Sequence, residues 1–222
     1  MTIFERNIHT YTIQEQLKLH KAKAIILGVG GGGSCIAEIF VRTGIGNITL
    51  VDYDVYEDSN KNRQIGALNS TIGKPKVDVM RKRLLDINSN CNIQTVCDGI
   101  NETNYTELLR DKDIIIDTVD GKENKLKVSR YVKNLNKVYT TGGLGGYNFW
   151  CATLKDCCIE EFIFPNTNEQ IIYPCASGVF AQAALQSQQA INYYLGREQH
   201  VVDKIIKVNQ QMLCMSVEDI GL

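Results

Sequence analysis

The sequence lacks a charge excess of either sign and lacks a long hydrophobic run, and each absence excludes a class of protein. Its 222 residues hold 24 basic and 25 acidic side chains, which gives a formal net charge of −1. That balance argues against a surface that binds nucleic acid generally. We find no signal peptide and no apolar segment long enough to span a membrane. We therefore expect a cytoplasmic protein with no membrane partner.

A disulfide scaffold is also excluded, although the chain contains eight cysteines. Scaffolds of that class are short secreted domains, and this chain is too long to be one. We expect reduced thiols, each with a role in packing, metal binding or chemistry. The chain has the length of an ordinary domain with a hydrophobic core, and no linker or internal repeat interrupts it. A single domain over residues 1–222 is predicted.

Apolar patterns predict strands that alternate with helices along most of the chain. The expected strands are 23–27, 47–51, 92–97, 113–117, 138–141 and 150–156, and the expected helices are 35–41, one that begins at Pro75, 125–132 and 178–195. Two final segments, 200–208 and 210–217, predict a closing antiparallel pair. Such alternation implies right-handed crossovers and a mainly parallel sheet. The predicted fold class is therefore α/β, Rossmann-like, with helices that flank the sheet.

A glycine-rich turn joins the first predicted strand to the first buried helix. Gly28, Gly30, Gly31 and Gly33 form the pattern G-x-G-G-x-G. In this context the loop amides and the positive end of the helix bind phosphate, and a Cβ atom would block its approach. Asp52 lies about twenty residues further on, at a strand end where a carboxylate accepts hydrogen bonds from a ribose. A flexible loop and an ordinary turn aspartate are the alternatives. Together the two features predict an adenine nucleotide, either NAD or ATP.

Polar and basic side chains after Asp52 favour ATP over NAD. They lie in "EDSNKNRQ" and "GKPK" and include Asn60, Arg63, Gln64 and Lys76. A hydride-transferring enzyme has little use for cations at this place, whereas a triphosphate needs them. Arg63 and Lys76 can neutralise the charge that develops on the phosphates as pyrophosphate leaves.

The segment "DIIIDTVDG" places three aspartates near the fourth predicted strand, whose carboxyl end is the usual ligand edge of a parallel sheet. A carboxylate beside a polyphosphate is repelled unless a divalent cation bridges the two. We expect Asp120 to bind Mg²⁺, which prefers oxygen ligands. Asp113 is expected to be a solvated strand end, and for Asp117 both interpretations remain open.

Several separate motifs resemble the ThiF/MoeB/HesA family, whose members are related to ubiquitin-activating enzymes. These motifs are "GVGGGGS", "LVDYDVYEDSNKNRQ", "GKPK" and "DTVDG", in the family's order. The similarity runs from "FERN" near the start to "GVFAQAALQSQQAINYYLG" near residue 196 and covers most of the chain. We accordingly expect an N-terminal arm and helix (1–22), a nucleotide-binding core (23–155), and a crossover loop, helix and closing strands (156–222).

The resemblance implies an adenylyltransferase, in which a carboxylate attacks the α-phosphate of magnesium-ATP to give an acyl-adenylate and pyrophosphate. Carried over by motif, the nucleotide-binding positions are Gly28, Gly30, Gly31, Gly33, Asp52, Asp54, Asn60, Arg63, Gln64 and Lys76. The implied catalytic residues are Arg63, Lys76 and Asp120, and Asp120 is also the implied magnesium ligand. Arg6 matches an arginine that family dimers insert into the partner's ATP site, which implies a homodimer.

The chain departs from the family pattern in two places. Many members hold zinc with two C-x-x-C pairs, but no such pair occurs here; the candidates are Cys157, Cys158, Cys175 and Cys214. Adjacent cysteines rarely both reach one tetrahedral ion, so zinc is not expected. The family's "DN" after the catalytic aspartate is "DG" here, Asp120 and Gly121, which removes a side-chain amide near the site. Cys175 matches a cysteine that takes up the activated group in some members, and a small half-buried residue is the alternative.

Several acceptors are compatible with this reading. The first is the C-terminal glycine carboxylate of a ubiquitin-like sulfur carrier protein, and a small-molecule carboxylate in cofactor biosynthesis is an alternative. The segments "RTGIG", "NRQIGAL" and "TTGGLGG" also resemble tRNA dehydratases that cyclise threonylcarbamoyl-adenosine. Those need a basic face for RNA, which the balanced charge disfavours. A nucleotide-binding module without catalysis is a further alternative, against which the presence of Arg63, Lys76 and Asp120 argues.

Overall fold

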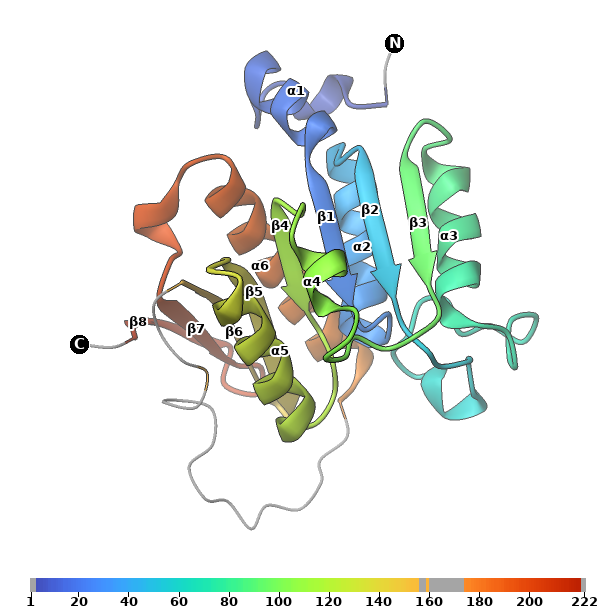
Figure 1. Ribbon diagram of the computed structural model, residues 1–222. Coiled ribbons are helices and arrows are strands. Elements are labelled where there is room, and N and C mark those ends of the chain that lie inside the picture. The colour runs from blue at the N-terminus through green and yellow to red at the C-terminus, as the bar shows by residue number, and fades with distance from the viewer. Residues whose placement is uncertain (1–2, 156–158, 160–173, 221–222) are drawn as a thin grey trace.

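One eight-stranded sheet forms the centre of the protein (Figure 1). The computed structural model describes residues 3–155, 159 and 174–220. In the order of the sheet, the strands are β3 (Asn92–Val96), β2 (Asn47–Val51), β1 (Lys23–Leu27), β4 (Ile114–Asp117), β5 (Tyr139–Gly145), β6 (Asn148–Leu154), β7 (Lys204–Asn209) and β8 (Cys214–Asp219). Neighbours from β3 to β5 are parallel, and those from β5 to β8 are antiparallel. The predicted α/β class and its closing antiparallel pair are confirmed.

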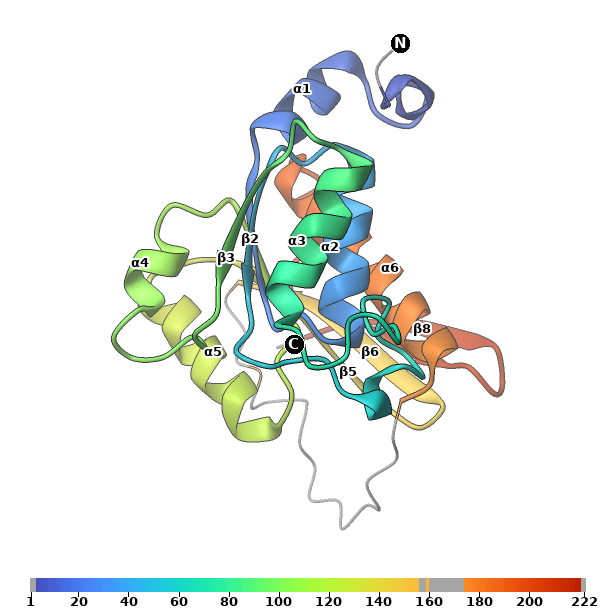
Figure 2. The same cartoon turned by 90° about the vertical axis from the view of Figure 1, so that its right-hand side faces the viewer.

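Helices cover both faces of the sheet (Figure 2). The helices are α1 (Ile13–Lys21), α2 (Gly31–Thr43), α3 (Lys76–Ile87), α4 (Tyr105–Leu109), α5 (Lys122–Asn134) and α6 (Ala176–Tyr194), with short 3₁₀ turns at Glu5–Asn7, Asp58–Asn60 and Glu198–His200. Helices α2, α3 and α6 lie on one face, and α4 and α5 lie on the other. Helix α1 lies beyond the amino ends of the central strands. No helix in the described ranges combines the length and apolar character of a membrane span.

The central parallel strands are apolar on both faces because helices bury both. Ile26 packs into the core beneath α2 and α3, whereas Ile25 and Leu27 pack into the core beneath α5. On α3, Val77, Met80 and Leu84 are fully buried, as their spacing predicts. These two cores fix the central strands, so the carboxyl ends of β1, β2 and β4 meet at one edge.

Several elements begin or end a few residues away from their predicted bounds, and β5 and α4 differ for a clear structural reason. Strand β5 continues to Gly145, within "GGLGG", whereas the predicted strand ends at residue 141. A Cβ atom on Gly142 would lie 2.8 Å from the carbonyl oxygen of Trp150 on β6, so only glycine permits this close pairing. Helix α4 was not anticipated, because it has only five residues and too few turns for a periodic pattern.

Candidate nucleotide-binding site

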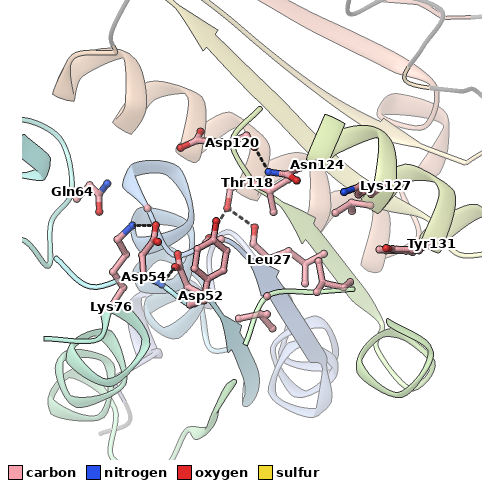
Figure 3. A pocket seen from close by; sticks show the side chains of 18 residues that line it. Leu27, Asp52, Asp54, Gln64, Lys76, Thr118, Asp120, Asn124, Lys127 and Tyr131 are labelled. Atoms are coloured by element: carbon pink, nitrogen blue, oxygen red, sulfur yellow. Dashed lines mark hydrogen bonds and ion pairs between the residues drawn. The ribbon is translucent and has the colours of Figure 1, made fainter. Parts of the chain in front are cut away.

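A cavity of about 250 Å³ opens at the edge where β1, β2 and β4 end (Figure 3). Its floor includes Leu27, Val51 and Thr118, which are the last residues of β1 and β2 and the first residue after β4. Figure 3 shows Gln64, Lys76 and Asp54 on one side, and Asn124, Lys127 and Tyr131 of α5 on the other. The cavity therefore lies at the edge where ligands bind in open parallel sheets.

The glycine-rich turn brings the start of α2 close to this cavity. Gly28 has a φ of +88°, and a Cβ atom there would lie 2.8 Å from the carbonyl oxygen of Thr118. A Cβ atom on Gly33 would overlap the carbonyl oxygen of Gly28. Gly30 is the N-cap of α2 and offers no side-chain cap to the helix amides. These free amides and the helix dipole favour an anion at the cavity.

Asp52 joins the end of β2 to the glycine-rich turn. Its Oδ2 atom accepts a hydrogen bond from the backbone N–H of Val29 at 2.6 Å, and its Oδ1 atom accepts one from Asp54 N–H at 2.8 Å. Each carboxylate oxygen keeps a lone pair for a further donor. The carboxylate is thus held in a fixed orientation at the cavity, as a contact to a ribose hydroxyl requires.

Lys76 and Gln64 are buried polar side chains on the side of the cavity that faces helix α5. The Nζ atom of Lys76 lies 2.8 Å from Oδ2 of Asp54, and Lys76 is only 6% exposed. Gln64 is also 6% exposed, and its Oε1 atom has no hydrogen-bond partner among the described residues. Buried polar atoms rarely lack a partner, so this acceptor points to a donor on a bound ligand.

Asp120 lines the cavity, whereas Asp117 and Asp113 do not. Asp117 is fully buried below the cavity, where it accepts hydrogen bonds from the Thr141 hydroxyl at 2.7 Å and from Lys125 Nζ at 3.4 Å. Asp113 precedes β4 and accepts a bond from the backbone N–H of Lys23 at 2.9 Å. It is exposed at the amino end of the strand, so it is the solvated strand end that was expected, although it does not border the carboxyl edge where Asp120 lies.

Six expected site residues lie outside the cavity lining: Gly31, Gly33, Asn60, Arg63, Arg6 and Cys175. The Arg63 guanidinium donates to the Ser59 carbonyl at 3.3 Å and to the Asn62 side chain at 2.8 Å. The Asn60 side chain accepts from the Glu57 N–H at 3.1 Å and so closes a local turn. Arg6 lies in the first 3₁₀ turn, beyond the amino ends of the strands and away from the cavity of its own chain (Figure 1).

Helix α5 supplies cavity residues that the sequence pattern missed. Asn124, Lys127, Val128 and Tyr131 all line the cavity. Their spacing of three, one and three residues places them on one helical face. The helix was predicted to begin at residue 125, whereas it begins at Lys122. An earlier start would have included Asn124 in the helix.

Cys175 is the N-cap of α6 and is exposed. The Ser177 hydroxyl, 3.2 Å from the thiol, and the backbone N–H of Gly178 lower the pKa of Cys175. Burial instead raises the pKa of Cys151 to about 12. Cys175 is therefore the more nucleophilic of the two thiols at neutral pH.

Metal binding can be assessed from the donor set. No cluster of three or more His, Cys, Asp or Glu side chains that could hold an ion occurs in the described segments. Cys157 and Cys158 lie outside them, so the expectation of no zinc stays a prediction. A Mg²⁺ ion that is bound together with substrate phosphates needs only one or two protein carboxylates. Asp120 offers one carboxylate at the cavity and so fits that requirement. Lys76 lies on the opposite wall of the same cavity.

Comparison with known proteins gives three findings. The ThiF family matches residues 4–217. A tRNA threonylcarbamoyladenosine dehydratase of Haemophilus influenzae is 38% identical over 138 residues, which are 61% of this chain and 53% of that protein. A probable molybdopterin-synthase adenylyltransferase of Porphyra purpurea is 33% identical over 132 residues, 60% of this chain and 35% of that protein. The chain thus spans about half or less of these relatives.

Among solved structures, the crystal structure of E. coli MccB with ATP has a TM-score of 0.87 at 24% identity. The match covers 99% of this chain and 71% of that chain. At this level of identity the match shows a shared fold. The aligned region includes the antiparallel strands β5 to β8, since the match covers nearly the whole chain.

The buried ion pair of Asp117 and Lys125 leads to a stability prediction. Lys125→Met should lower the free energy of unfolding by about 3–5 kcal/mol, because it leaves a buried carboxylate without its cation. Lys23→Met is the matched control, since the Lys23–Asp111 pair is half exposed at 3.5 Å, and it should cost about 1 kcal/mol or less. Urea unfolding measures both. Equal losses would contradict a special role for the buried pair.

The lowered pKa of Cys175 leads to a reactivity prediction. Because a lowered pKa leaves more thiolate near neutral pH, iodoacetamide should alkylate Cys175 with a pH midpoint below 9.0, the ordinary value for cysteine. Mass spectrometry of peptides from briefly treated folded protein follows the reaction, and Cys175→Ser identifies its signal. Cys151 should stay unmodified. A Cys175 midpoint above the ordinary value would contradict the helix-cap explanation.

Proposed function

This chain belongs to the ThiF family, and we propose on that premise that it activates a carboxylate by ATP-dependent adenylation. The observation that carries the proposal is the cavity itself, which gathers Asp52, Lys76 and Asp120 beside the free amides of α2. In the proposed reaction a carboxylate oxygen bonds to the α-phosphorus of ATP. The bond from this phosphorus to the bridging oxygen breaks, and pyrophosphate leaves with the electron pair.

Each cavity residue has a separate task in this proposal. Asp52 accepts hydrogen bonds from the ribose, and the unpartnered Oε1 atom of Gln64 accepts one from a ligand donor. The first amides of α2 hold phosphate oxygens. Lys76 neutralises phosphate charge when it exchanges its bond to Asp54 for one to the nucleotide.

Arg63 and Asn60 are proposed to bind the phosphates from outside the cavity lining. A Cβ atom on Gly31 would lie 3.5 Å from Cγ of Arg63, so the stem of this arginine borders the start of α2. Within the described residues its guanidinium bonds only neutral oxygens, those of Ser59 and Asn62. A phosphate is a stronger acceptor for the guanidinium than either of them.

Mg²⁺ fits the residues on the Asp120 side of the cavity. Asp120 would be its protein ligand, and the bound ion would offset the repulsion between this carboxylate and the phosphates. The buried groups below Asp120 hold its loop in place, as described above for Asp117.

The proposed acceptor is first the C-terminal glycine of a ubiquitin-like sulfur carrier. The balanced charge of the chain and the similarity to a molybdopterin-synthase adenylyltransferase support it. The second candidate is a modified tRNA nucleoside, which the 38% identity to a tRNA dehydratase supports. Helix α5 also carries exposed Lys127 and Arg130 near the cavity, a local basic feature that overall charge balance does not reveal. Small-molecule carboxylates are a third group to test.

Asp120→Ala tests the function. This variant should lower carboxylate-dependent exchange of pyrophosphate into ATP by at least about 100-fold, because an electrostatic group at the phosphates is lost. ATP should still bind. Asp86→Ala, an exposed aspartate on α3, is the control and should exchange normally. Exchange is measured with the carrier protein, the tRNA and small carboxylates in separate reactions. Undiminished exchange in Asp120→Ala would refute the assignment.

We also propose a homodimer in which Arg6 completes the site of the partner subunit. The 3₁₀ turn that holds Arg6 lies beyond the amino ends of the central strands, whereas the cavity lies at their carboxyl ends, so a role of Arg6 in such a site requires another copy. Arg6→Ala and Asp120→Ala should each be inactive alone. A refolded mixture should regain exchange, because a mixed dimer contains one intact site. A mixture as inactive as its components would exclude a shared site.

A further inference from the structure

The residue after Asp120 adopts a backbone conformation that favours glycine. Gly121 has φ +85° and ψ 139°, outside the regions that L-residues populate. An asparagine at this position, as the family pattern has, would be strained here. A Cβ atom built on Gly121 would lie 3.8 Å from Nδ2 of Asn124. The amide of Asn124 thus lies beside the place where a side chain on residue 121 would begin.

Asn124 bonds directly to the backbone of Asp120. Its Nδ2 atom donates to the Asp120 carbonyl oxygen at 2.9 Å, and the side chain also lines the cavity (Figure 3). Asn124 lies in the first turn of α5, whose middle and last turn pack into the core through Val128 and Val132. The bond therefore anchors Asp120 to a rigid helix.

The chain that enters Asp120 is fixed independently. The Thr118 hydroxyl donates to the Gly28 carbonyl at 2.7 Å, and the Val119 N–H donates to Asp117 Oδ1 at 3.0 Å. After Asp120 the chain passes through Gly121, which has the least restricted backbone torsions of any residue. The Asn124 amide bond spans this glycine. The Gly121 carbonyl also accepts a bond from the Lys125 N–H at 3.1 Å, so the Asn124 side chain is what extends the attachment to α5 from Gly121 to Asp120.

We propose that Asn124 is a positioning residue for Asp120, and that it supplies from α5 the side-chain amide that position 121 cannot carry. The proposal rests on the proposed function, because it gives Asp120 the task of meeting the metal-bound phosphates. Groups that orient a metal ligand are typically worth about 10–100-fold in metal affinity. Asn124 acts through the backbone of Asp120.

Calorimetry of ATP binding, with Mg²⁺ and with EDTA, tests the proposal. Asn124→Ala should weaken binding of ATP with Mg²⁺ by about 10-fold and leave Mg²⁺-free binding unchanged, because only the metal-bound form depends on the orientation of Asp120. In an Asp120→Ala background the same substitution should cause no further loss, since coupled residues are not additive. Asn134→Ala, at the exposed end of the same helix, is the matched control.

A second variant separates positioning from folding. Asn124→Asp keeps the size of the side chain but cannot donate to the Asp120 carbonyl when ionised, so it should lose the same Mg²⁺-dependent binding. Thermal unfolding should remain close to wild type for at least one variant. Equal weakening of binding with and without Mg²⁺, or an undiminished effect in the Asp120→Ala background, would overturn the proposal.

These outcomes differ from a failure of the proposed function. If no carboxylate supports pyrophosphate exchange, yet binding of ATP with Mg²⁺ depends on Asn124 only when Asp120 is present, the positioning role holds and the adenylation proposal fails. If wild-type binding ignores Mg²⁺, the metal assignment of Asp120 fails, and the inference about Asn124 fails with it.

Discussion

The buried carboxylate of Asp117 is the interaction on which the arrangement of the cavity depends. Its oxygens accept bonds from Thr141 on β5, Lys125 on α5 and the backbone of Val119. On the other face of the sheet, the buried Gln186 of α6 donates to the Asp117 carbonyl at 3.1 Å. Two helices and two strands therefore meet at one residue, directly before the loop that carries Asp120. A polar network of this kind is stable only when every member is satisfied, so it holds the loop in a single conformation.

The two sides of the cavity differ in how their charges are held. Asp52 is fixed by backbone amides, and it stays in place whether or not a ligand is bound. Lys76 is held by the half-exposed carboxylate of Asp54, a partner that a polyphosphate can replace. Because a buried ammonium must keep a partner, the exchange of Asp54 for a phosphate conserves the pairing of Lys76. The site can therefore remain folded without nucleotide and still offer a cation to it.

Most of the fold follows from the sequence because parallel strands buried on both faces read as unbroken apolar runs, and β1 and β2 have the predicted bounds. The length of β5 does not follow from the sequence, because its glycines are required by the close approach of Trp150 on β6. A local sequence pattern does not reveal such a contact between strands. In the site, Asp52 and Lys76 were identified by motif and both line the cavity. Asn124 was missed because α5 begins after Gly121, and the first residues of the helix are polar and give no apolar periodicity. The positive φ of Gly121, which marks this start, is seen only in the structure.

The contacts outside the cavity link the phosphate side to the start of α6. Asn62 accepts from the Arg63 guanidinium at 2.8 Å, and its own amide donates to the Pro174 carbonyl at 3.2 Å. Pro174 directly precedes Cys175, the exposed thiol with the lowered pKa. In the proposed reaction, Arg63 would exchange the oxygen of Asn62 for a phosphate oxygen. One asparagine side chain thus contacts both Arg63, for which phosphate binding is proposed, and the residue before Cys175, although the thiol itself takes no part in the cavity lining.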